Sequence, residues 1–156
     1  MFKDFDISSF KKMKPPGDNT FDAMQEIKSL KKIPLNKKFV KDYDNIEAAF
    51  KKTAKDQGVD YDNKIAKKII AKSAPLILKL KKHFNRPRPK ELAKKMNIKI
   101  KDIEMDSMKT PSYPSGHTVQ GISYSRNVAR AHYKSDSKMG EKLANAMYKH
   151  VNNKEI

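Results

Sequence analysis

A histidine and an aspartate near the end of the chain have the types and the spacing of a nucleophilic site. His132 and Asp136 are four residues apart, a spacing that puts both on one face of a helix. The carboxylate can then bind one imidazole nitrogen and fix the tautomer of the ring. An imidazole oriented in this way can act as a nucleophile.

The turn at residues 114–117, with the sequence PSGH, has the composition of an anion-binding loop. Ser115 offers a hydroxyl. Gly116 has no side chain, so its backbone N–H can approach an anionic oxygen closely. His117 follows at the rim of this loop. The residues therefore predict a phosphate site that needs no metal ion and no cofactor.

The placement of arginine supports a phosphate site. The chain has 35 Lys and Arg residues, and only four of them are Arg. They are Arg86, Arg88, Arg126 and Arg130. Because the planar guanidinium can bind two phosphate oxygens at once, arginines confined to two short segments indicate phosphate binding.

Together these residues resemble the three-part signature of the type 2 phosphatidic acid phosphatase superfamily. That superfamily includes the bacterial class A non-specific acid phosphatases and the vanadium haloperoxidases. The order and the internal spacings of all three parts agree over residues 81–136. The parts are Lys81-x6-Arg88-Pro89, Pro114-Ser115-Gly116-His117 and Ser125-Arg126-x5-His132-x3-Asp136.

The resemblance implies a metal-independent phosphomonoesterase of the acid phosphatase type, acting on a phosphate ester. It implies that His132 attacks phosphorus to form a phosphohistidine, that Asp136 orients the imidazole and that His117 protonates the leaving alcohol. The resemblance also implies a set of residues that bind the phosphate oxygens. They are Lys81, Arg88, Ser115, Gly116 and Arg126.

Two features depart from the family pattern. Arg130 stands where members often have glycine, and only seven residues, 118–124, separate the second part from the third. If residues 118–131 formed one straight helix, the two histidines would lie about 22 Å apart. We therefore expect either a reversal of the chain near Gly121 or a swapped homodimer in which His117 and His132 come from different subunits.

Composition limits the class of protein. A chain of 156 residues predicts one domain, and the absence of Cys excludes disulfides and thiolate metal sites. The longest apolar stretch, around residues 74–80, is broken by Lys79 and is shorter than the roughly 20 residues that span a bilayer. Within the family this favours the soluble branch, and we expect a cytoplasmic protein without a signal peptide.

The pattern of apolar residues predicts an all-α bundle with the site where several helix ends meet. Helices are expected over residues 19–32, 38–56, 60–83, 90–97 and 132–151, with an extended leader over residues 1–18. Pro75 should kink or divide the third helix. Residues 85–89 should be extended, so that Arg86 and Arg88 face one anion. Phe21 is expected in the apolar stripe of the first helix.

Two other functions are compatible with these residues. A family member that has lost activity would bind phosphate or vanadate without turnover, and a vanadate-dependent peroxidase is a weaker variant. Alternatively, the net charge of +17 favours non-specific binding of nucleic acid or another polyanion. That alternative explains the charge but not the confinement of arginine to two segments.

Overall fold

The structure, a computed structural model, describes residues 1–120 and 129–153, and within these ranges it contains helices and no strand. The prediction of an all-α fold is confirmed. The elements are α1 (Ser8–Lys11), α2 (Phe21–Lys31), α3 (Lys37–Asp42), α4 (Ile46–Gln57), α5 (Asn63–Phe84), α6 (Pro89–Lys95), a 3₁₀ helix η1 (Asp106–Lys109), α7 (Gly116–Val119) and α9 (Lys134–Asn152). No described helix combines the length and the apolar character that crossing a membrane would require.

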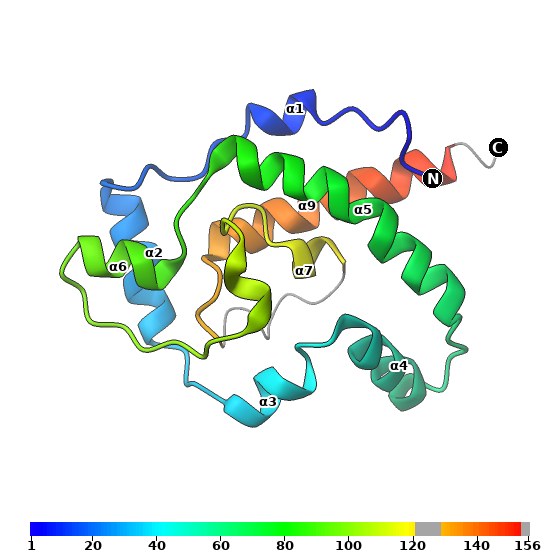
Figure 1. The fold of residues 1–156 in the computed structure, drawn as a ribbon, viewed down its shortest axis with the longest axis horizontal. Helices are drawn as coiled ribbons and strands as arrows, with labels where there is room; N and C mark the ends of the chain where they lie inside the picture. The colour runs from blue at the N-terminus through cyan, green and yellow to red at the C-terminus, as the bar shows by residue number, and fades with distance from the viewer. Residues whose placement is uncertain (121–128, 154–156) are drawn as a thin grey trace.

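The long helix α5 is the axis on which the other elements are arranged (Figure 1). It contacts α1, α4 and α7, and α7 in turn packs on α9, while α2 pairs with α6. Asp62 caps the start of α5, because its carboxylate accepts the backbone N–H groups of Lys64 and Ile65. Pro75 lies inside α5 and does not divide it. Ile77 and Leu80, which follow Pro75, are buried, and their packing offsets the lost hydrogen bond.

Most of the core lies where α5, α9 and the first ten residues meet. Ile77 and Leu80 of α5 pack against Leu143 of α9 and against Ile7 and Phe10. Ile7 and Phe10 are each only 7% exposed, and residues 8–11 form α1. The predicted extended leader is therefore partly helical and contributes to the core.

The first two predicted helices differ from the structure in informative ways. Thr20 caps α2 as expected from its hydroxyl, but Phe21 is 66% exposed and does not join the core. Residues 38–56 do not form one helix. Asn45 starts α4 as a separate helix, since its side chain accepts the N–H of Ala48. Gly58 ends α4 in the left-handed region, with φ of 64°.

The segment between α5 and α6 is short and non-helical, as the two prolines predict. Asn85 ends α5 with φ of 46°, and α6 begins at Pro89, where the missing N–H costs nothing. This arrangement carries the chain from the end of α5 directly into the candidate site.

Candidate active site

A cavity of about 200 Å³ brings residues from five separate parts of the chain together. Its walls come from α5, Arg88, the loop around η1, the start of α7 and His132. The lining residues are Ala74, Ile77, Leu78, Lys81, Arg88, Ser107, Thr110, Gly116, His117, Gln120 and His132. Five of the eight predicted site residues are thus in one cavity.

Both predicted catalytic histidines of a single chain line this cavity. The helix α7 ends at Val119, so residues 118–131 do not form one straight helix. The expected reversal near Gly121 lies outside the described residues, as do Ser125 and Arg126. The arrangement that needs two subunits is therefore not required to bring His117 and His132 to one place.

His132 is buried and its two ring nitrogens have different partners. Nδ1 lies 3.1 Å from Asp136 Oδ2, and Nε2 lies 3.0 Å from Arg88 Nη1. A guanidinium can only donate, so Nε2 must accept, which puts the ring proton on Nδ1, where it is donated to Asp136. Burial lowers the pKa of His132 to about 3, against the opposing effect of the hydrogen bond that Nδ1–H donates to Asp136. His132 is therefore neutral near pH 7, with the lone pair of Nε2 at the cavity.

Asp136 holds His132 from the first turn of a helix, and not across one helical face as the spacing predicted. His132 precedes α9, while Asp136 is the third residue of that helix. The fully buried carboxylate also accepts the backbone N–H of Tyr133 at 3.0 Å. Burial alone would raise the pKa of Asp136, but the hydrogen bond from His132 and the nearby cations lower it. A helix N-terminus further favours this negative charge.

Arg86 does not face the cavity, which corrects the prediction that it shares an anion with Arg88. Its Nη1 donates to Asp136 Oδ1 at 2.6 Å, and its Nη2 donates to Glu26 Oε2 at 2.8 Å. The guanidinium is 3.8 Å above the ring of Tyr133. The side chains of Arg86 and Arg88, two residues apart, therefore have different partners. Arg86 binds Asp136 outside the cavity, and Arg88 lines the cavity.

Glu26 is a supporting residue that the sequence did not reveal. Besides binding Arg86, its carboxylate accepts the backbone N–H of Ser135 at 2.8 Å and the hydroxyl of Ser135 at 2.9 Å. It thus fixes the start of α9, where His132 and Asp136 meet. In the sequence Glu26 is one of many charged residues on a helix, and only its polar neighbours in space distinguish it.

Arg88 and Lys81 are buried cations that are held by carbonyl groups. Arg88 donates from Nε to Thr110 O at 2.9 Å and from Nη1 to Ala131 O at 2.8 Å. Lys81 donates from Nζ to the carbonyls of Pro111 and Ser112. Burial, together with the charge of Arg88, lowers the pKa of Lys81 to about 7. An anion in the cavity would raise this pKa again and favour the charged amine.

The PSGH turn is only partly as predicted. Gly116 and His117 line the cavity, but Ser115 does not. Ser115 is fully buried, and its Oγ accepts the hydroxyl of Thr118 at 2.9 Å and, as the cap of α7, the N–H of the same residue at 3.4 Å. A Cβ on Gly116 would lie 3.3 Å from Ile77 Cγ2. The glycine therefore permits close packing of α7 on α5.

Gly140 is a second residue that sequence reasoning missed. An added Cβ would lie 2.8 Å from Thr118 Cβ and 2.9 Å from the carbonyl oxygen of Ser115. Only a glycine allows α9 to approach α7 this closely, and the contact places His117 opposite His132. The sequence offered one signal, a glycine inside an amphipathic helix. Glycine there costs about 1 kcal/mol of helix stability relative to alanine, so its presence indicates a close packing contact.

Arg130, which departs from the family pattern, lies at a position that suits glycine. Its φ of 55° is in the left-handed region, where most side chains are disfavoured. Three hydrogen bonds from its guanidinium, to the carbonyls of Lys31, Ile33 and Lys101, hold it in place. Arg130 is not among the residues that line the candidate active site.

Comparison of the chain with protein-family models, with curated proteins and with solved structures gives no significant match. Among the described residues, no group of three or more His, Asp and Glu side chains is arranged to hold a metal ion. The chemistry of the site is therefore inferred from its own geometry.

Proposed function

We propose that this protein is a phosphomonoesterase that acts through a phosphohistidine on His132. One observation carries the proposal. The imidazole of His132 is held through Nδ1 by Asp136, while Nε2 meets Arg88 in a cavity that also contains His117 and Lys81. An oriented neutral imidazole beside two buried cations is the arrangement that attack on a phosphate ester requires.

Arg88 defines where the phosphoryl group binds. Without a ligand, its Nη1 donates to Nε2 of His132 and occupies the lone pair needed for attack. A phosphate oxygen is a stronger acceptor than an imidazole nitrogen, so it would take over this hydrogen bond. The lone pair of Nε2 would then face phosphorus. The small cavity volume suits a phosphoryl group with the ester group outside it.

The first chemical step forms a bond from Nε2 of His132 to phosphorus and breaks the bond from phosphorus to the ester oxygen. Protonated His117 gives its proton to that oxygen, and the alcohol leaves. Positive charge that develops on the His132 ring is stabilised by Asp136. Because Arg86 and Glu26 hold Asp136 and the start of α9, the ring need not reorient during the step.

The second step returns the enzyme to its starting state. Neutral His117 takes a proton from water as the water oxygen attacks phosphorus, and the bond to Nε2 breaks. Orthophosphate leaves the cavity. Lys81, Arg88 and the backbone N–H of Gly116 would bind the equatorial oxygens, on which negative charge is spread in the transition state.

Hydrolysis of a chromogenic phosphate ester in the presence of EDTA tests this function. We expect turnover by the wild-type protein with EDTA present, and a loss of more than about a thousandfold in His132→Ala, because removal of a nucleophile leaves only the binding groups. Lys37→Ala, which changes an exposed lysine, is the control and should keep full activity. Turnover that EDTA abolishes and a divalent ion restores, or an active His132→Ala protein, would contradict the proposal.

A further inference from the structure

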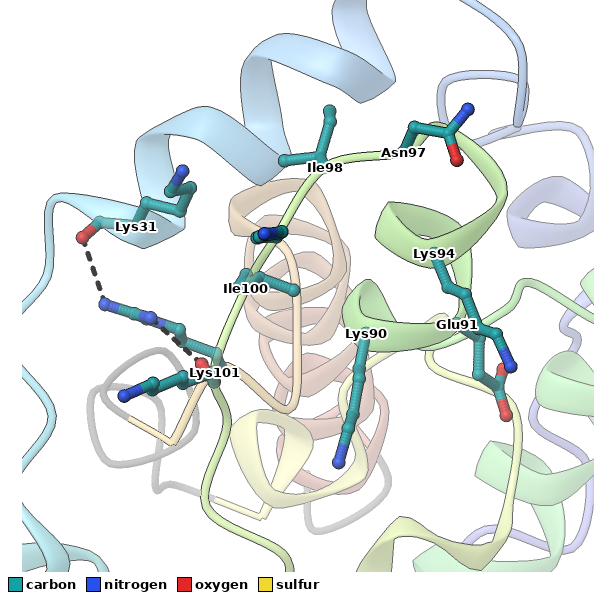
Figure 2. Close-up of a pocket in the computed structure, with 10 residues that line it drawn as sticks. Lys31, Lys90, Glu91, Lys94, Asn97, Ile98, Ile100 and Lys101 are labelled. Atoms are coloured by element: carbon teal, nitrogen blue, oxygen red, sulfur yellow. Dashed lines mark hydrogen bonds between the residues drawn. The ribbon is translucent and has the colours of Figure 1, made fainter.

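A second cavity, about 880 Å³ in volume, lies beside α2 and α6 (Figure 2). It shares no lining residue with the candidate active site. Six of its ten lining residues are cations and one is a carboxylate. They are Lys31, Lys90, Glu91, Lys94, Asn97, Ile98, Lys99, Ile100, Lys101 and Arg130.

This concentration of charge is greater than the lysine-rich surface alone would give. The cavity between α4 and α5 is lined by one acid, Asp62, and by no cation. The cavity that contains Lys109 has three cations and three carboxylates. Positive charge is therefore unevenly distributed among the described cavities, and the cavity beside α2 and α6 holds the excess.

Most of these cations are not neutralised by the protein. Lys90 does form ion pairs, with Asp102 and Glu104. The other lysines of the cavity form no ion pair with any described residue. They are Lys31, Lys94, Lys99 and Lys101. Like charges that share a cavity repel each other, and a bound anion would remove that repulsion.

Arg130 fixes the segments that carry these lysines. It donates to the carbonyls of Lys31 at 3.0 Å and Lys101 at 2.9 Å, the two hydrogen bonds drawn in Figure 2. The end of α2 is thereby tied to the chain that follows α6. Arg130 is only 9% exposed, and its Nε has no hydrogen-bond partner among the described residues. The backbone of these two segments is thus held in place before a ligand binds, which lowers the part of the entropic cost of binding that comes from ordering the chain.

We propose that this cavity binds a small, multiply phosphorylated anion at a site separate from the catalytic cavity. Its volume lies in the range of about 300–1,000 Å³ that is typical of small-molecule sites. Several unpaired cations around one space match closely spaced negative charges. None of the described residues that line the cavity is aromatic, and aromatic side chains form the stacking surface by which proteins bind single-stranded nucleic acid. A compact polyphosphate is therefore favoured over a nucleic acid.

Titration calorimetry with tripolyphosphate tests this site. The double variant Lys94→Gln/Lys101→Gln should bind on the order of tenfold or more weakly than the wild type, because two charge contacts are lost. The control is Lys64→Gln/Lys68→Gln, which removes the same charge from exposed positions on α5 and should bind as the wild type does. Backbone amide shifts on titration should map to Lys31 and to residues 94–101.

Three results would overturn the site: no binding by the wild type, equal weakening in both double variants, or amide shifts confined to residues 116–120 and 132. The hydrolysis assay separates this site from the catalytic one. Lys94→Gln/Lys101→Gln should hydrolyse a chromogenic ester at the wild-type rate. The calorimetric result stands whether or not the chain hydrolyses esters, so failure of one proposal does not entail failure of the other.

Discussion

At the scale of single residues, the site depends on keeping His132 neutral and Asp136 charged in a buried place. The two side chains are 3% and 0% exposed. Burial favours the neutral imidazole, whereas Arg86, the N–H of Tyr133 and the hydrogen bond from His132 favour the carboxylate. The same environment that keeps the His132 imidazole neutral therefore also makes the folded state sensitive to acid.

This coupling predicts how stability depends on pH. The folded pKa of His132, about 3, lies below its ordinary value of 6.5, so its contribution to stability is complete above about pH 6.5. It is lost as pH falls from there towards 3, because the unfolded chain takes up the proton first. The free energy of unfolding should fall by up to about 1.4 kcal/mol per pH unit more steeply than in a protein without this group.

Urea unfolding of the wild type and of His132→Gln between pH about 6.5 and about 4 measures the difference in slope. Glutamine does not titrate, so its protein should lack the steeper dependence. The other histidines are present in both proteins and cancel in the comparison. Equal slopes for the two proteins would show that His132 is not buried in the neutral form.

At the scale of elements, the catalytic geometry depends on the close contact of α7 with α9. The helix α7 is only four residues long and carries His117, while His132 immediately precedes the N-cap of α9. Gly140 sets the distance between α7 and α9. The carbonyl of Asp136 also accepts the N–H of Ser115 at 3.1 Å. The two histidines are therefore brought together by backbone contacts, and any residue that separates these helices should reduce activity.

Gly140→Ala tests this contact. Alanine favours the helix by about 1 kcal/mol, but its Cβ would overlap Thr118 Cβ and Ser115 O, and overpacking costs about 1–3 kcal/mol. We expect a lower melting temperature and a turnover number lower by on the order of tenfold or more. The control, Glu141→Ala, changes the exposed neighbour and should leave both unchanged. A Gly140→Ala protein that is stabilised and fully active would contradict the role of this glycine.

At the scale of the whole molecule, segments from different parts of the sequence meet around two cavities of different character. α5, Arg88, the loop around η1, the start of α7 and His132 line the candidate active site, and Glu26 of α2 supports it through Arg86. Residues of α2 and α6 line the cavity beside them (Figure 2). The candidate active site contains the buried cations Lys81 and Arg88, whereas four lysines of the cavity beside α2 and α6 form no ion pair with a described residue.

The sequence predicted those features that depend on local chemistry. The two prolines predicted the non-helical segment between α5 and α6, and the motif spacing predicted that Lys81, Arg88 and His132 share one site, where all three line one cavity. Features that depend on distant contacts were not predicted. Arg86 and Arg88 have the same local pattern, and partners distant in the sequence, Glu26 and Asp136, hold Arg86 away from the cavity.

The burial of Ile7 and Phe10 was missed for a similar reason. The apolar residues of the first ten alternate with charged and polar ones without a helical stripe, and the partners of Phe10 are on α5 and α9. The division of residues 38–56 followed from Asn45, whose capping hydrogen bond competes with continuation of the helix. The reversal near Gly121 and the position of Arg126 lie outside the described residues and stay predictions.

The most direct test of the account is to trap the covalent intermediate. The protein is mixed with a phosphate ester, denatured within one turnover under alkaline conditions that preserve phosphohistidine, digested and analysed by mass spectrometry. The account predicts a phosphoryl group on His132 in the wild type and none in His132→Ala. With an activated aryl ester, whose leaving group needs no proton from His117, His117→Ala should accumulate more phosphorylated His132, because release by water is slowed. A phosphoryl group on another residue, or turnover by the wild type with no phosphorylated His132 in any sample, would contradict the assignment of His132 as the nucleophile.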